Sequence, residues 1–115
     1  MIILDATTKS LEVILGGAVT TNQLDVACHA INILDSTMGV TDIVNTNIAT
    51  NSTTAVTVMA APAASNSRTV KSLTVYNKDT VAATVTVRIN SNGTFFILVK
   101  TTLAVADSLI YSAED

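Results

Sequence analysis

Residues 68–111 contain four short stretches rich in threonine, β-branched and aromatic residues, and turn-forming residues separate these stretches. Within 84–89, Val85, Val87 and Ile89 alternate with threonine and arginine, a pattern typical of a strand buried on one side. Threonine, β-branched and aromatic residues suit a pleated sheet, and they dominate this segment. It therefore predicts four successive β-strands, at 70–77, 84–89, 94–103 and 109–111, joined as a hairpin meander.

Two groups of turn-forming residues define this predicted meander. Asn-Lys-Asp at 77–79 predicts the first turn, and Asn-Ser-Asn-Gly at 90–93 predicts the second. Asparagine and glycine are favoured at such positions because they tolerate the positive φ of tight hairpin turns. The strand that follows is apolar on both faces from Phe95 to Val99. We therefore expect 94–103 to be a central strand covered on both sides.

The first half of the chain adds further candidate strands. Residues 11–15 and 54–59 read as strands, and Gly16-Gly17 ends the first of them. Residues 24–34 fit two structures: every second residue from Leu24 to Ala30 is apolar, but the spacing of the apolar residues to Leu34 also suits a helix. Their position between threonine-rich strands favours a strand.

Residues 36–54 are rich in asparagine, threonine and serine, with isolated apolar residues. They predict a long extended loop with at most a short strand near 41–44. The total of seven or eight short strands separated by turn signals predicts one all-β domain over residues 1–115, an antiparallel β-sandwich or jelly-roll-like fold.

The chain has few charges: 13% of its residues are charged and 49% are hydrophobic. Such a composition favours a domain that covers part of its surface in an assembly, and a monomer coated with threonine is the alternative. The net charge of −3 and the lack of a basic cluster argue against a nucleic-acid partner. The sequence shows no signal peptide and no apolar run of membrane-spanning length, so we expect a soluble product and no membrane partner.

No motif for catalysis, a cofactor or a metal stands out. Cys28 is the single cysteine and alternates with apolar residues, which predicts a core position, and His29 is the single histidine. Asp35 and Asp42 lack the regular spacing of a calcium loop. No nucleophile-elbow sequence or Ser-His-Asp set is recognisable. We therefore expect a non-enzymatic protein without a cofactor.

The one candidate contact site lies at the N-terminus, where Ile2, Ile3 and Leu4 form an apolar triplet. Three such side chains are too apolar to remain in water, so we expect the triplet to be docked. It can form an edge strand on its own sheet, or residues 1–9 can act as an arm that docks on a neighbouring subunit. The polar link that follows, Thr-Thr-Lys-Ser, favours the neighbour.

Both ends of the sequence resemble small β-rich virion proteins of tailed bacteriophages. The resemblance rests on the runs LDATTKSLEVILGGAVTTNQLDV and KSLTVYNKDTVAATVTVRINSNGTFFILVKTTLAVADSLIY, and it weakens from about residue 30 to residue 54. Its pattern is a strand ending in Tyr-Asn-x-Asp, a Thr/Val strand, an Asn-Gly turn, a strand of the ILVK type and a closing Leu-x-Tyr strand. Such proteins often carry glycine in the last turn, where this chain has Ala106-Asp107.

The resemblance implies a non-enzymatic virion subunit. The expected role is a capsid decoration (cement) protein on the capsid surface, with the major capsid protein and copies of itself as partners. Two alternatives are a host-surface or carbohydrate-binding module of a head or tail fibre, and a tail or neck connector subunit. Tyr76, Tyr111, Phe95 and Phe96 are the only aromatic residues, and we expect the two phenylalanines to lie in the core.

Overall fold

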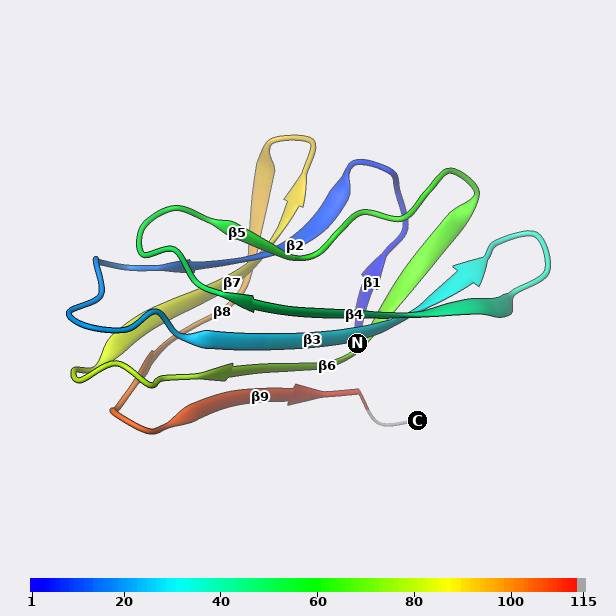
Figure 1. Ribbon diagram of the computed structural model, residues 1–115. Coiled ribbons are helices and arrows are strands. Elements are labelled where there is room, and N and C mark those ends of the chain that lie inside the picture. Colours follow the sequence, from blue (N-terminus) through cyan, green and yellow to red (C-terminus); the bar gives the residue numbers. More distant parts are fainter. Residues whose placement is uncertain (114–115) are drawn as a thin grey trace.

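Two antiparallel β-sheets face each other and form a β-sandwich, as the sequence predicts (Figure 1). The computed structural model describes residues 1–113, which contain no helix and therefore none that could cross a membrane. The strands in this part of the chain are β1 (Ile2–Leu4), β2 (Lys9–Leu15), β3 (Asp25–Leu34), β4 (Gly39–Ala49), β5 (Val56–Met59), β6 (Asn66–Tyr76), β7 (Ala83–Ser91), β8 (Thr94–Leu103) and β9 (Ser108–Ser112). The strand expected at 24–34 is confirmed as β3.

The first sheet has the order β1-β6-β3-β4, with β9 also paired to β6, and the second has the order β5-β2-β7-β8. β3 pairs with β6 along its whole length, so β1 and β9 share the opposite side of β6. β1 pairs with residues 68–70 and β9 with residues 72–76. The first and last strands of the fold therefore form one row at the edge of the first sheet.

The hydrophobic core lies between the two sheets. The alternation of Val85 and Val87 with threonine is confirmed, because both valines are buried against the first sheet. Cys28 lies in the core as predicted, and burial raises the pKa of its thiol to about 11. The buried apolar side chains are Leu4, Leu11, Val13, Leu15, Leu24, Val26, Cys28, Ala30, Val58, Met59, Val70, Leu73, Val75, Val85, Val87 and Leu103.

The connections gather at two ends of the sandwich. At one end, which we call the hairpin end, the Asn92 N–H donates to the Thr8 carbonyl at 3.0 Å and the Asp35 N–H to the Ser65 carbonyl at 3.0 Å. These bonds join the β7–β8 turn to the β1–β2 link and the β3–β4 turn to the β5–β6 link. At the other end, the loop end, the β2–β3, β4–β5, β6–β7 and β8–β9 connections meet.

The expected meander of four hairpin strands is wrong. Of its joints only β7–β8 is a hairpin, and its turn is confirmed: Asn92 and Gly93 both have positive φ, 52° and 90°. The residues at 77–79 do form a turn, but they lead from β6 in the first sheet to β7 in the second, and β8 returns to β9 in the first sheet. Each of these two connections passes from one sheet to the other, so the two strands that it joins do not pair.

The expected central position of strand 94–103 is also wrong. β8 pairs only with β7 and is an edge strand of the second sheet. Phe95, Phe96, Ile97 and Leu98 are all exposed, so the two phenylalanines expected in the core lie at the surface. The strand paired along its whole length on both sides is β3 in the first sheet, which lies between β6 and β4.

The long loop expected at 36–54 is wrong as well, because residues 39–49 form the eleven-residue strand β4. β4 pairs with β3 in ten residue pairs, from Asp25–Ala49 to Leu34–Gly39. Its side chains stay mostly exposed, since β4 is the edge strand of the first sheet. Backbone pairing with β3 therefore holds this strand, although its side chains bury little surface.

The β8–β9 turn contains a strained residue, because Ala106 has φ 64°, a region that alanine rarely adopts. We expect Ala106→Gly to raise the free energy of unfolding by about 1 kcal/mol, since glycine adopts this conformation without a steric cost. Ala104 does not have a positive φ, so Ala104→Gly should lower stability instead. Urea unfolding of both variants tests this, and a loss of stability in Ala106→Gly would contradict it.

Candidate functional site

The N-terminal triplet lies in the chain's own first sheet. Ile2, Ile3 and Leu4 form β1, which pairs antiparallel with residues 68–70 of β6, and the Ile2 N–H donates to the Tyr111 hydroxyl at 3.0 Å. Leu4 is fully buried in the core and Ile2 packs against it. The structure thus shows the edge-strand alternative, not the arm on a neighbour that the sequence favoured. Ile3 alone is exposed on the outer side, and its contact with a partner stays a prediction.

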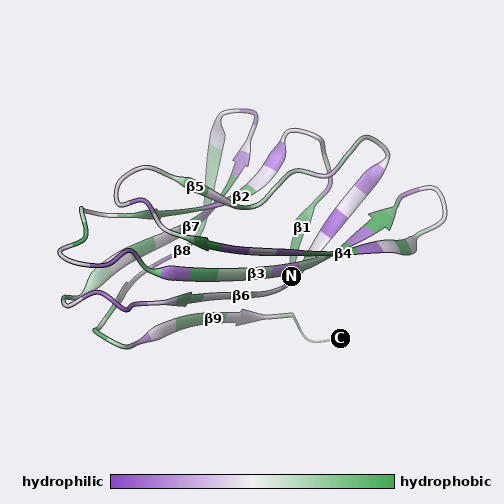
Figure 2. Cartoon of the chain, viewed as in Figure 1, coloured by the Kyte–Doolittle hydropathy of each residue, from purple (hydrophilic) through white to green (hydrophobic). Residues whose placement is uncertain are grey.

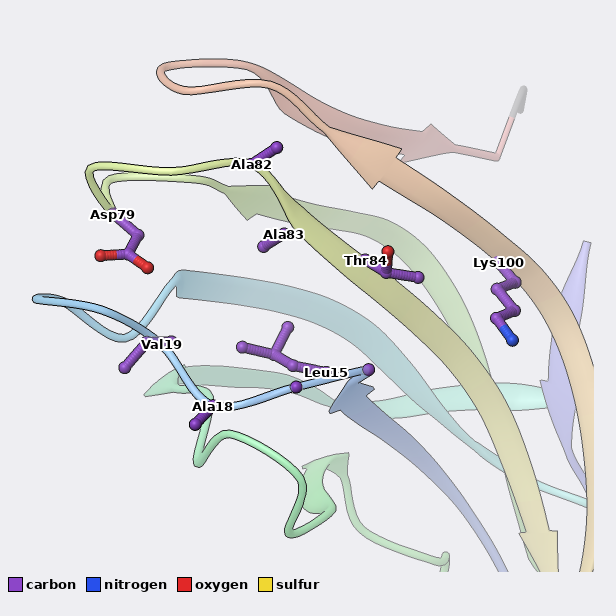
Figure 3. Close-up of a pocket in the computed structure, with 10 residues that line it drawn as sticks. Leu15, Ala18, Val19, Asp79, Ala82, Ala83, Thr84 and Lys100 are labelled. Atoms are coloured by element: carbon purple, nitrogen blue, oxygen red, sulfur yellow. The ribbon is translucent and has the colours of Figure 1, made fainter.

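A cavity of about 450 Å³ lies at the loop end. Leu15, Ala18 and Val19 line one side, and Asp79 and Lys100 stand at its margins (Figure 3). The Asp79 carboxylate is already occupied by backbone N–H groups, and Lys100 has no acidic partner within ion-pair distance among the described residues.

Asp79 instead holds the β2–β3 loop. Its carboxylate accepts hydrogen bonds from the N–H groups of Thr20 at 2.9 Å, Thr21 at 2.8 Å and Asn22 at 3.0 Å. The hydrogen bond from Thr20, followed by that from Asn22, holds the pKa of Asp79 well below its usual range. The carboxylate therefore works as a structural clamp between two loops.

This clamp predicts a loss of stability in acid. The pKa of Asp79 is lower in the folded chain than in the unfolded chain, so the unfolded chain binds more protons as the pH falls. The stability that the carboxylate contributes is complete above the pKa of aspartate in the unfolded chain, about 4. It is lost progressively as the pH falls below this value. Asp79→Asn should be less stable at neutral pH and should lose less stability between about pH 5 and pH 2. Thermal unfolding across this range checks the difference in slope, and identical slopes would contradict it.

A shallower depression of about 430 Å³ lies on the outer face of the first sheet. Ala27 of β3 lies at its centre, opposite Asn47 of β4 on one side and Thr74 of β6 on the other. Tyr76 is half-exposed at its rim, beside Asp25, whose carboxylate forms a 2.9 Å ion pair with Lys78. An aromatic ring beside amide, hydroxyl and carboxylate groups is an arrangement that sugar-binding sites use. The sequence does not predict this depression, because the three strands that form it are distant along the chain.

The two residues that could bind a metal point to opposite faces of β3. Cys28 faces the core, whereas His29 is exposed and its Nδ1 lies 2.7 Å from the Asn45 side-chain oxygen. Over residues 1–113, no three side chains of the histidine, cysteine and acidic types come together as a possible metal site.

Exposed apolar side chains are most concentrated on β8. Four consecutive residues, from Phe95 to Leu98, are exposed on both faces of this strand, with Ile97 at 64% and Phe96 at 55%. In Figure 2 the β8 side of the β7–β8 hairpin is green, while the arrowhead of β7 is purple. Long exposed apolar edges are rare in soluble monomers, because they pair with other chains. The sequence did carry this signal, in an apolar run on both faces, but the same run is typical of a central strand.

A polar cluster on the outer face of the second sheet fixes the position of Phe95. Glu12 of β2 is buried and pairs with the Arg88 guanidinium at 3.0 Å, while the Asn90 amide donates to the other carboxylate oxygen at 2.9 Å. The Arg88 guanidinium lies 3.7 Å from the centre of the Phe95 ring, which is a cation–π contact. The exposed edge is therefore presented on a rigid support.

The surface features of this chain are thus suited to binding: an apolar strand edge, a polar depression beside a tyrosine, and loops tied down by buried hydrogen bonds. Comparisons of the chain with protein-family models, with curated protein sequences and with solved structures found no match.

Proposed function

We propose that this protein is a non-enzymatic structural subunit of a phage virion, which decorates and stabilises the capsid surface. The observation that carries the proposal is the exposed apolar edge from Phe95 to Leu98, held on a rigid sandwich. The resemblance of the sequence to small virion proteins supports the proposal that this chain is part of a phage virion. The low charge and the net charge of −3 agree with protein partners and not with nucleic acid.

The proposed partners are the major capsid protein and other copies of this chain. In this role the sandwich sits across junctions between capsid subunits, and its exposed edges cover apolar surface on them. Each contact is modest, but many symmetric copies add their contributions, so that the lattice resists rupture. The loop end is suited to a contact that resists rupture of the lattice, because Asn77 and Asp79 connect its loops through hydrogen bonds.

The proposal is tested with particles of the phage that encodes this chain, compared with and without the protein. Particles that lack it are expected to release their genome at a lower temperature, and adding back the purified protein should restore the original value. A Phe96→Ala, Ile97→Ala double variant should restore less, while Ile110→Ala, which alters an equally exposed isoleucine on β9, should restore fully. Equal heat resistance with and without the protein would contradict the cement role.

A second candidate function is a carbohydrate-binding module, which the depression beside Tyr76 favours. A sugar ring stacked on Tyr76 would lie within reach of Asn47 and Thr74. The isolated protein and its Tyr76→Ala variant would be screened against glycans by isothermal titration calorimetry. Binding at millimolar or lower concentration that is lost in Tyr76→Ala would rank this function above decoration.

A further inference from the structure

β8 is paired on one side only. β7 occupies one of its edges, and no strand within residues 1–113 occupies the other. The backbone N–H and C=O groups on the open side are therefore free to form a new ladder, which is how sheets accept an added strand. β8 also lacks the usual protection of such edges near its start: residues 94–98 contain no proline and no charge.

The open edge continues into an apolar slot between the two sheets. This slot has a volume of about 280 Å³ and is lined by Leu98 and Val99 of β8 and by Leu73, Leu109 and Tyr111 of the first sheet. The sandwich is thus incompletely closed on the side where β8 and β9 face each other. An added strand beside β8 would pair the edge and cover the mouth of the slot at once.

The start of β8 is complementary to itself. The pairing with β7 places Phe95 and Ile97 on the outer face, opposite Asn90 and Arg88, and Phe96 on the inner face, opposite Ile89. In an antiparallel pair centred on Phe96, the two Phe96 side chains oppose each other, and Phe95 of each copy faces Ile97 of the other. These three central pairs are apolar, and each joins side chains on the same face of the sheet, as a stable cross-strand pair requires.

The ends of this segment limit the pairing to residues 94–98. The Asn92-Gly93 turn lies on one side, and on the other the register with β7 shifts between Val87 and Arg88, which marks a bulge next to Leu98. Lys100 lies beyond the bulge and meets no charged residue in this register. The β4 edge of the first sheet is less suited to self-pairing, since β4 carries Asp42 and three threonine or asparagine residues after it.

We propose that two copies of this chain associate through their β8 edges, antiparallel and centred on Phe96. The dimer is isologous, with the same five residues contributed by each copy, and joins the two second sheets into one continuous eight-stranded sheet. It does not depend on the proposed virion role. Each copy contributes five residues, fewer than the roughly 20–30 of a standard interface, so we expect a dissociation constant in the micromolar range.

A charge-swap experiment tests both the partner and the register. Sedimentation velocity from about 1 to 200 μM should show the wild-type chain passing from monomer to dimer. Phe96→Lys and Phe96→Asp should each weaken the dimer at least about tenfold, because two like charges then face each other. An equimolar mixture of the two variants should form a heterodimer at least as well as either forms a homodimer, since opposite charges now meet. Ile43→Lys, at a more exposed site on β4, should dimerise like the wild type.

A wild-type chain that stays monomeric at the highest concentration would overturn the proposal. So would equal weakening by Ile43→Lys, or a mixture that fails to associate while circular dichroism shows both variants folded. If a charged variant does not fold, Phe96→Cys decides. Facing Cβ atoms in such a pair lie about 5 Å apart, close to disulfide geometry, so mild oxidation should give a covalent dimer. The native Cys28 is buried and serves as the internal control, and absence of the covalent dimer counts against the proposal.

Discussion

Replacing Asn77 by alanine is expected to lower the free energy of unfolding by about 3 kcal/mol, because several buried hydrogen bonds are lost together. The Asn77 side chain is fully buried. Its amide donates to the carbonyls of Val81 at 3.0 Å, Leu103 at 3.0 Å and Ala104 at 3.2 Å, and its oxygen accepts from the Asp79 N–H at 2.9 Å. Alanine leaves the Leu103 carbonyl and the Asp79 N–H buried without partners, and burial of such unpaired groups is costly.

Urea unfolding of Asn77→Ala measures this loss, with Asn22→Ala as the matched control. Asn22 lies at the same loop end, but its side chain is exposed and makes one hydrogen bond, to the Lys78 carbonyl at 3.2 Å. Its removal should cost less than about 1 kcal/mol. If both variants lost equal stability, burial of the Asn77 network would not be the source of the effect.

The second large effect is expected at Leu4, in the segment for which the sequence favours a neighbouring subunit over an edge strand of its own sheet. Leu4 is fully buried in the core, so Leu4→Ala should lower the free energy of unfolding by about 2–4 kcal/mol through lost burial and a new cavity. Ile3 is the adjacent residue on the opposite face and is 47% exposed. Ile3→Ala should therefore change stability by less than about 1 kcal/mol.

Chemical denaturation of the monomer at low concentration distinguishes a β1 that belongs to the chain's own core from a β1 that docks on a neighbouring subunit. A large loss for Leu4→Ala with a small one for Ile3→Ala places β1 in the chain's own core. The opposite result, in which Leu4→Ala is as stable as the wild type and only assembly suffers, would restore the arm that docks on a neighbour.

Much of the fold follows from local pattern. Val85 and Val87 alternate with polar residues and are both buried, and the Asn92-Gly93 pair forms the positive-φ turn that it favours. These features depend on neighbours along the chain, so the sequence carries them directly. The two-sheet sandwich follows in turn, because several half-buried strands must cover their apolar faces.

Other features depend on partners distant in sequence. The sequence predicts a loop at β4 because its apolar residues are isolated among asparagine, threonine and serine, yet ten residue pairs with β3 hold it as a strand. At β6 the register with β3 shifts near Lys71, which places Val70 on the same inner face as Leu73 and Val75 although strict alternation separates them. No pattern within a single strand reveals such a bulge.

The positions of the exposed apolar edge and of the N-terminal triplet also depend on strands that are distant in sequence. An apolar run such as Phe95 to Leu98 is compatible with a central strand and with an exposed edge that awaits a partner, and only the strand order distinguishes them. The triplet at residues 2–4 was recognised as docked, but its partner, residues 68–70, lies more than sixty positions away. In both segments the pairing with other strands, rather than local β-propensity, determines where the side chains lie.

The most direct test of the proposed role is an electron cryo-microscopy reconstruction of the intact particle of the phage that encodes this chain. The proposed role predicts density for the sandwich on the outer capsid surface, in contact with the major capsid protein at junctions between its subunits. Density for the sandwich on a tail fibre or neck, or its absence from the particle, would contradict it.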